Sequence, residues 1–206
     1  MRPTLIGKTA PDITVYDMNN YPMNFYKAID TNDYTILVFW NSECSHCKQE
    51  IPELLEVWKD SLHLQYNVGV FSISTEIEKE HADEFIKEHN LAGNFTNAYD
   101  PTGRSNFRKL YDVNSTPVVI VLDKNKKIIA KKVAIKDLTY VISTYVNFEK
   151  NKAHQNSSCN LGSKIIPTMR RNPFYDSCYN CSYCYFMPFH RKLIHIQGNC
   201  KSKYRN

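Results

Sequence analysis

Two apolar runs of strand length stand out in the first half of the chain. Residues 34–40 (YTILVFW) and residues 68–74 (VGVFSIS) are dominated by β-branched and aromatic side chains. Continuous apolar runs of this length are typical of strands that are buried on both faces of a sheet. We therefore predict two buried strands at these positions.

The segments that follow both runs have the period of a helix. After the first run, apolar residues recur three or four positions apart, at Ile51, Leu54, Leu55, Trp58 and Leu62. After the second run, the acidic stretch 77–89 contains apolar Phe85 and Ile86 and predicts another helix. The order strand, helix, strand, helix implies a parallel βαβ core.

The later pattern predicts a ββα unit. A turn signal at residues 100–103 (DPTG) precedes a short helix with Phe107 and Leu110. Two strand-like runs follow at 118–122 and 127–135, and their four-residue connector makes them an antiparallel pair. A last amphipathic helix is marked by Leu138, Val141, Ile142, Tyr145 and Val146. The expected class is α/β in three layers: a mixed central sheet, helices on both faces, and an N-terminal extension.

Charge divides the 206-residue chain near residue 150. Residues 1–150 carry 17 basic and 20 acidic side chains, whereas residues 151–206 carry nine basic and one acidic. The second segment is rich in Cys and Tyr and shows no helical or strand period. We predict one redox domain over 1–150 and a basic tail over 151–206 that is either unstructured or a reading-frame artefact.

Several classes of protein do not fit this composition. No apolar run approaches the roughly 18 residues that span a bilayer, and the N-terminus lacks the apolar stretch of a secretory signal. The basic tail could act as an arm for nucleic acids or membrane surfaces. We expect neither nucleic-acid binding nor membrane contact from this chain.

Cys44-Ser45-His46-Cys47 falls between a buried strand and the apolar stripe of a helix, so it lies at a helix N-terminus. Unpaired amides and the helix dipole favour an anion there, and a partly protonated His46 adds to the effect, so the thiol pKa falls. Cys44 at the exposed first position is the expected nucleophile. Cys47, one turn further, can resolve a mixed disulfide, and the cycle needs no cofactor.

Other uses of the cysteines remain open. A Cys-x-x-Cys pair can be half of a zinc site or a structural disulfide. The tail could supply further thiolate ligands for zinc or an iron–sulfur cluster, although the spacing is poor; these are Cys178, Cys181, Cys184 and Cys200. The alternatives are therefore a metal-binding module that uses Cys44, Cys47 and the tail cysteines, and a peroxiredoxin-like peroxidase.

Pro52 lies within the predicted helix, five residues after Cys47. A proline inside a helix removes one hydrogen bond and bends the axis, and a proline at the first helical position starts the helix. We favour the bend.

The segment WNSECSHCKQEIP resembles the active-site segment of thioredoxin-like proteins, with Trp40 ahead of the motif and packed beside the site. Ser115-Thr116-Pro117 matches the position where these proteins carry a cis-proline that faces the cysteines. The resemblance implies that the Thr116–Pro117 bond is cis and that the Thr116 backbone pairs with an extended substrate segment.

Residues 5–149 resemble more specifically the TlpA/ResA-like branch of thiol-disulfide oxidoreductases, notably the Bacteroidetes-type redoxin domains. The matching segments are IGKTAPDITVYDMNN, FWNSECSHC, Glu76 after VGVFSIST, and YDVNSTPVVIVLDKNKKIIAKK. The resemblance implies a reductase of the periplasm or cell envelope that acts on protein disulfides and receives electrons from an upstream redox protein. Family members usually carry an export signal or anchor, so this chain is expected to be a fragment.

Glu76 matches an acidic residue that lies near the cysteines in that branch. A carboxylate there would raise the thiol pKa by like-charge repulsion or relay a proton to a leaving thiolate, whereas a solvated glutamate at a helix start explains the residue equally well. The direction of electron flow is also open, because a thiolate stabilised by His46 makes the disulfide more oxidising and the resemblance implies a reductant.

Overall fold

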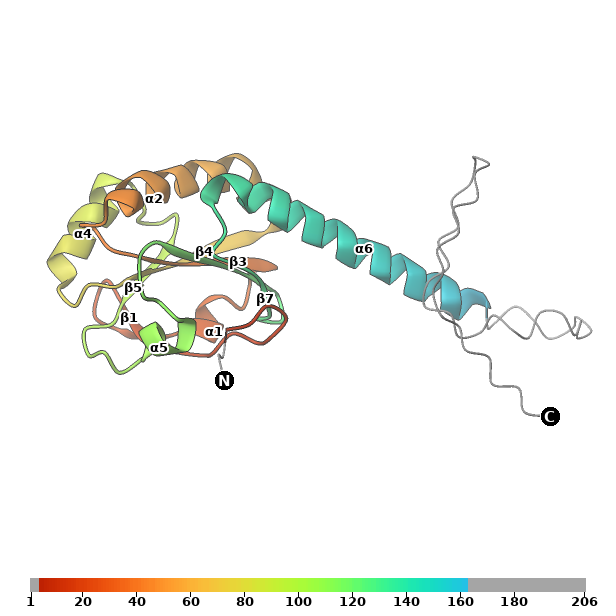
Figure 1. Ribbon diagram of the computed structural model, residues 1–206, viewed down its shortest axis with the longest axis horizontal. Helices are drawn as coiled ribbons and strands as arrows, with labels where there is room; N and C mark the ends of the chain where they lie inside the picture. The colour runs from red at the N-terminus through yellow and green to blue at the C-terminus, as the bar shows by residue number, and fades with distance from the viewer. Residues whose placement is uncertain (1–3, 163–206) are drawn as a thin grey trace, which may run out of the picture. The chain divides into compact units, whose positions relative to one another are not determined.

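The computed structural model describes residues 4–162, with side chains as far as residue 153. A seven-stranded mixed sheet lies at the centre, in the order β2-β1-β5-β4-β3-β6-β7 (Figure 1). Its strands are β1 (Thr14–Asp17), β2 (Pro22–Asn24), β3 (Tyr34–Trp40), β4 (Val68–Ser74), β5 (Thr96–Tyr99), β6 (Val118–Asp123) and β7 (Ile128–Lys131). The α-helices are α1 (Phe25–Ala28), α2 (Ser45–Val57), α3 (His63–Tyr66), α4 (Lys79–Glu88), α5 (Phe107–Tyr111) and α6 (Leu138–Gly162).

The two apolar runs form the middle of the sheet, as predicted. β3 and β4 are parallel in a register that pairs Tyr34 with Val68 and Trp40 with Ser74. Their carboxyl ends therefore meet at the same edge, next to the N-terminus of α2. β6 runs antiparallel to β3, and β7 runs antiparallel to β6, which confirms the expected βαβ and ββα units.

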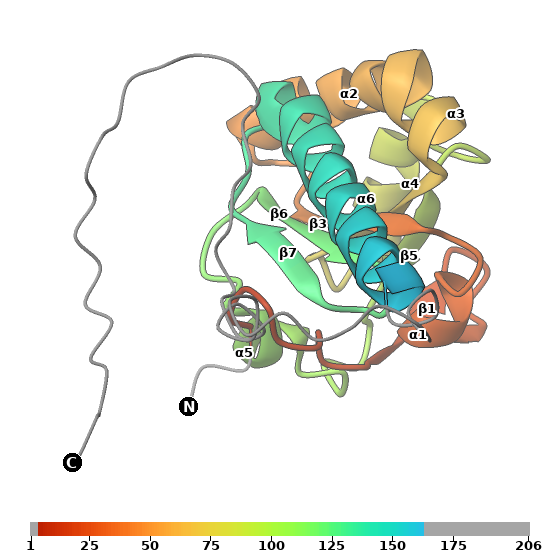
Figure 2. The ribbon, with the colours of Figure 1, turned by 90° about the vertical axis from the view of Figure 1, so that its right-hand side faces the viewer.

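Two buried clusters cover the two faces of the sheet. One holds Ile51, Leu54 and Leu55 of α2 with Phe85 and Ile86 of α4. The other holds residues of α1 and α5 with the opposite face of the same strands. Figure 1 shows α2 and α4 on one side of the sheet and α1 and α5 on the other. α6 begins beside α2 (Figure 2), and its first turns pack on this side through Leu138, Ile142 and Val146. The three-layer arrangement follows from the sequence pattern.

The helix after β3 differs from a single regular helix. It begins at Ser45, so Pro52 lies in its interior and does not start it. Residues Trp58–Leu62 form a π-helix, which leads into α3. The predicted apolar stripe is buried along its whole length, because Trp58 and Leu62 remain on the inner face of the π-helical turn.

Several short elements depart from the sequence prediction. β1, β2, α1 and β5 are additional elements, and residues 127–135 do not form one strand. β7 ends at Lys131 because Lys132 adopts a left-handed backbone conformation, and a 3₁₀-helix follows at Ile135–Asp137. Lysine adopts this conformation rarely, so the run KIIAKKVAI gave no sign of the break.

The N-terminal segment pairs with the outer edge of the sheet at the start of β7. The Gly7 amide donates to the Ile128 carbonyl at 2.7 Å, and the Ile128 amide donates to the Lys8 carbonyl at 2.9 Å. Thr9 forms an isolated bridge with Lys127. At the other edge of the sheet, β2 is three residues long and begins with Pro22.

α6 continues to Gly162, so it includes residues that the change of composition assigned to the tail. The tail cysteines Cys178, Cys181, Cys184 and Cys200 lie outside the described residues. Within residues 4–162, no helix combines the length and apolar character needed to cross a membrane.

Candidate functional site

Cys44 is placed at the helix start by the end of β3. Cys44 is the N-cap residue of α2, and its sulfur accepts the Cys47 backbone amide at 3.4 Å. The Cys44 carbonyl accepts the Lys48 amide at 3.1 Å, which begins the helical hydrogen-bond pattern. The first amides of a helix have no intrahelical partner, so their N–H groups remain available to the sulfur.

The Cys44 thiol is partly exposed and donates to the Thr116 carbonyl at 3.2 Å. Burial raises the pKa of this thiol. Hydrogen bonds from the side chains of Thr116 and Cys47, and from the backbone amides of Cys47 and His46, outweigh burial and lower the pKa below its ordinary value. The Cys44 thiol therefore ionises more readily than an ordinary cysteine thiol.

Cys47 has the opposite environment. Its side chain is fully buried, and burial raises the pKa of its thiol to about 12. Its amide and side chain nevertheless face Cys44, and both cysteines are free thiols. The two sulfurs thus differ in access and in acidity, as expected for an attacking and a resolving thiol.

The Thr116–Pro117 peptide bond is cis, as predicted. It directly precedes β6, the antiparallel neighbour of β3, and this pairing brings Thr116 to the Cys44 sulfur from 72 positions along the chain. Both residues are half-buried.

Trp40 is fully buried at the end of β3 and belongs to the same apolar cluster as Cys47. Its indole nitrogen donates to Ser72 Oγ at 2.7 Å, and its ring stacks on Phe85 of α4 at 4.6 Å between centroids. Trp40 thus packs beneath the site, in the position that the sequence suggested.

Glu76 follows β4 and reaches the loop before Cys44. Its carboxylate accepts the Ser42 hydroxyl, a longer contact from the Ser42 amide at 3.4 Å, and the Ser74 hydroxyl at 3.0 Å. Neither serine was singled out from the sequence. The sequence holds one hint of this contact: Ser74 and Glu76 stand at the end of one predicted strand, and Ser42 follows the end of the other.

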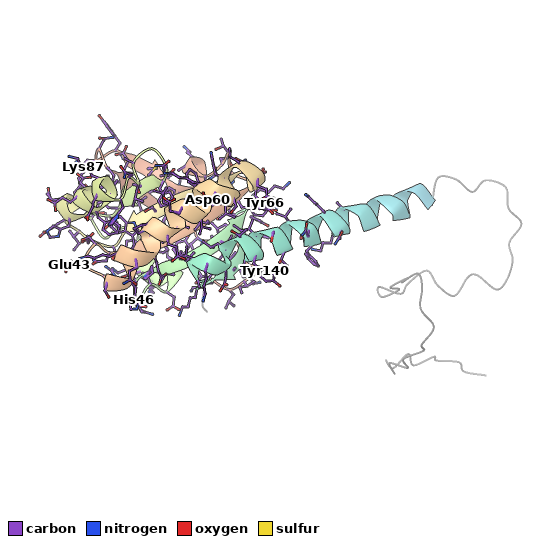
Figure 3. All side chains as sticks on the ribbon, turned by 90° about the horizontal axis from the view of Figure 1, so that it is seen from above. Glu43, His46, Asp60, Tyr66, Lys87 and Tyr140 are labelled. Carbon is purple, nitrogen blue, oxygen red and sulfur yellow. The ribbon has the colours of Figure 1, made fainter. Side chains whose placement is uncertain are left out.

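His46 lies on the surface at the start of α2. Figure 3 shows His46 and Glu43 at the periphery of the molecule, where α2 begins. Both side chains are exposed. His46 contributes its backbone amide to the Cys44 sulfur. A role for the imidazole remains a prediction.

Among the described residues, no three His, Cys, Asp or Glu side chains gather in a way that could hold a metal ion. The alternative in which tail cysteines complete a metal site involves residues outside this range.

Comparison with known proteins agrees with this geometry. Residues 6–131 match the family model described as the AhpC/TSA family. A domain of a "possible thiol-disulfide isomerase" from Cytophaga hutchinsonii is 33% identical, with a TM-score of 0.67 over 73% of this chain and 99% of that chain. The thioredoxin domain of a thiol-disulfide oxidoreductase from Bacteroides vulgatus is 22% identical, with a TM-score of 0.60 over 69% of this chain and 98% of that chain, which shows the fold. A "Thioredoxin-like protein" of Haemophilus influenzae is 23% identical over 61% of this chain and 70% of its own length.

Proposed function

Because the chain belongs to the AhpC/TSA family and has the thioredoxin-like fold of thiol-disulfide oxidoreductases, we propose that it reduces disulfides in protein substrates with the Cys44/Cys47 dithiol. The observation that carries this proposal is the asymmetry of the two sulfurs. Cys44 is partly exposed with a lowered pKa, and Cys47 is buried with a pKa raised to about 12.

The first step is an attack on the substrate disulfide. The Cys44 thiolate forms a bond to one substrate sulfur, the substrate S–S bond breaks, and the second substrate sulfur leaves as a thiolate. The helix amides that face Cys44 stabilise the attacking anion. The sulfur is also partly exposed, so it can reach a substrate.

The second step uses Cys47. At neutral pH this thiol is protonated, so it must lose its proton as it attacks the Cys44 sulfur of the mixed disulfide. The substrate thiolate released in the first step is a suitable base. The Cys44–Cys47 bond forms as the bond between Cys44 and the substrate sulfur breaks, and that sulfur leaves as a thiolate. The substrate has then received two electrons, with one proton from Cys47 and the second from solvent.

Thr116 and Pro117 serve as the docking position for the substrate in this proposal. The Thr116 carbonyl lies 3.2 Å from the Cys44 sulfur, so a substrate segment that pairs with the Thr116 backbone would present its disulfide to Cys44. Trp40 supports the floor of the site from below.

The proposed setting is the cell envelope or periplasm, where the protein acts as a reductant that an upstream redox protein recharges. The resemblance of residues 5–149 to TlpA/ResA-like reductases supports this setting. A measurement of the reduction potential tests the direction of electron flow. A value at or below that of a dithiol reductant such as thioredoxin, about −270 mV, would support a reductant, and a value near −120 mV would contradict it.

Substrate trapping tests the function. The Cys47→Ser variant keeps the nucleophile and lacks the resolving thiol, so it should accumulate mixed disulfides through Cys44 with a disulfide-containing model protein. Wild-type protein should instead reduce that substrate in the presence of dithiothreitol. Normal turnover by Cys47→Ser would rule out the proposed cycle, and rapid peroxide consumption by the wild type would favour the peroxidase alternative.

A further inference from the structure

The loop between β3 and α2 is tied to the loop after β4 through Ser42. This residue stands two positions before Cys44, and its hydroxyl donates to Glu76 Oε1 while its amide lies 3.4 Å from Glu76 Oε2. Ser42 and Glu76 are both half-buried, so solvent has only partial access to this hydrogen bond.

The loop that carries Glu76 is itself held in place by hydrogen bonds. The Ser74 hydroxyl donates to Glu76 Oε2 at 3.0 Å, and Ser74 Oγ accepts the Glu76 amide at 3.2 Å. The neighbouring Thr75 amide donates to the Trp40 carbonyl at 2.8 Å, and the Thr75 carbonyl accepts Arg108 Nη2 at 2.7 Å. The loop that carries Glu76 is therefore held by β3 and by α5.

The Ser42 side leads directly to the nucleophile. The Asn41 side chain accepts the Glu43 amide at 2.9 Å, and the Asn41 carbonyl accepts the Cys44 amide at 3.2 Å. The loop is a tight turn, so a displacement of Ser42 also moves Cys44. Cys44 in turn must stay at the helix start for its sulfur to face the first amides of α2.

We propose that Ser42 and Glu76 form a clamp that holds Cys44 in register with the amides of α2, and that Glu76 acts on the nucleophile through Ser42. Ser42 is thus a positioning residue for disulfide exchange, and the inference rests on the proposed function. In this role the Glu76 carboxylate serves as an acceptor for two serine hydroxyls. Repulsion of the Cys44 thiolate and relay of a proton are not its tasks.

The clamp and direct repulsion predict opposite effects of removing the Glu76 charge. If Glu76 repels the thiolate directly, Glu76→Gln lowers the pKa of Cys44 and raises its reactivity at neutral pH. If Glu76 acts through the clamp, the same variant weakens the contact, because one of the two oxygens that accept from Ser42 and Ser74 becomes an NH₂ group. The sulfur then loses its amide contacts, the pKa of Cys44 rises, and its reactivity falls.

The test measures alkylation of Cys44 by iodoacetamide from pH 5 to pH 10 in the full chain. Because the chain has seven cysteines, peptide mass spectrometry must resolve the product at Cys44. We expect Ser42→Ala and Glu76→Gln each to slow alkylation at pH 7 by about three- to tenfold, the size of one lost hydrogen bond, and to move the midpoint to higher pH. The double variant should be no slower than the more affected single variant, because both residues belong to one contact.

Two further variants guard the interpretation. Ser42→Thr keeps the hydroxyl and should retain the wild-type rate and midpoint. Glu78→Gln removes an exposed charge two residues from Glu76, at a helix start where its side chain makes no cap hydrogen bond, and should change neither. If Glu76→Gln does not fold, the comparison of Ser42→Ala with Ser42→Thr decides.

Faster alkylation in Glu76→Gln, an unchanged rate in Ser42→Ala, or additive effects in the double variant would each overturn the clamp. Alkylation reports the Cys44 thiolate without any substrate. If the alkylation results contradict the clamp while the wild type reduces its substrate, the proposed function still holds. If the wild type does not reduce a protein disulfide, the proposed function is wrong, and the alkylation results still test the clamp.

Discussion

The two ends of β3 both carry a hydrogen-bond network, and only one of them holds a reactive group. At the amino end, Asp123 accepts the Asn125 amide at 2.8 Å, the Lys127 amide at 2.9 Å and the Tyr145 hydroxyl at 3.2 Å. We call this region the turn end, comprising Tyr34 with residues 123–127 and 145. At the carboxyl end, residues 41–47, 74–76 and 116–117 lie around Cys44, and we call this region the sulfur end.

The difference lies in what each network encloses. The turn end closes a hairpin around an aspartate that is 8% exposed, and Tyr34 packs edge-on against Tyr145 with ring centroids 6.2 Å apart. Its bonds therefore contribute to stability alone. At the sulfur end, similar bonds hold a thiol whose ionisation they also control. Substitutions at the turn end should change stability and spare chemistry, and substitutions at the sulfur end should do the reverse.

The largest contrast is expected for Cys44→Ser at the sulfur end. A serine hydroxyl is a far weaker nucleophile than a thiolate, so disulfide reduction should fall by about a thousandfold or more. The side chain is small and partly exposed, so the thermal unfolding midpoint should change by no more than a few degrees. An insulin reduction assay and calorimetry measure the two quantities, and substantial remaining turnover would assign the chemistry to another residue.

Gly69→Ala tests the stability side, close to the turn end. Gly69 pairs with Thr35, and a Cβ at this position would lie 2.0 Å from the Asn32 side-chain nitrogen. The Asn32 side chain must swing away and give up its 3.4 Å hydrogen bond to Thr35 Oγ1, which should cost about 1 kcal/mol of unfolding free energy. Urea denaturation measures the loss. A disulfide reduction rate that falls by more than about twofold in the folded variant would break the separation between the two ends.

Tyr145→Phe removes one donor to Asp123. We expect a loss of about 1 kcal/mol at pH 7 and no change in disulfide reduction. Burial and the charge of Asp123 raise the pKa of Tyr145 to about 12 in the folded state, above the unfolded value of about 10. Wild-type protein therefore loses this contribution to stability as the pH rises from 10 to 12, whereas the phenylalanine variant does not. Denaturation curves for the pair should converge over that range, and a constant gap would contradict the assignment.

His46→Ala should have the smallest effect. Loss of the imidazole near the thiolate should raise the pKa of Cys44 and make the reduction potential more negative. The side chain is exposed and screened by solvent, so we expect less than one pKa unit, or less than about 30 mV. Equilibration with glutathione measures the potential. An unchanged or more positive value would remove the imidazole from the mechanism.

The sequence predicted the elements whose apolar pattern is long. β3 and β4 are continuous apolar runs, and the buried stripe that begins in α2 repeats over three turns, so burial alone indicates these elements. β5 has the sequence TNAY and only two of its four residues are buried, so its pairing with β4 depends on backbone hydrogen bonds that leave no side-chain signal. The π-helix at Trp58–Leu62 also leaves no signal in the sequence, because its apolar residues fit the period of a regular α-helix.

The parts of the candidate site that lie close together in the sequence could be predicted, and the contacts between distant residues could not. Cys44 and Cys47 lie one helical turn apart, and their position between a strand and a helix is visible in the sequence. The contact of Ser42 with Glu76 joins residues 34 positions apart, and the contact of Cys44 with Thr116 joins residues 72 apart. Contacts of this kind depend on the register of β3 with β4 and β6, which only the folded sheet supplies. Ser42 and Ser74 were therefore missed.

The N-terminal segment that pairs with β7 also bears on the behaviour of the protein at high concentration. An uncovered edge strand offers amides and carbonyls to a strand of another molecule, and such recruitment leads to aggregation. Here Gly7, Lys8 and Thr9 occupy that edge. The opposite edge strand, β2, is short and starts with Pro22, which has no amide hydrogen to donate. Loss of the first nine residues would therefore leave the β7 edge of the sheet open to a strand of another molecule.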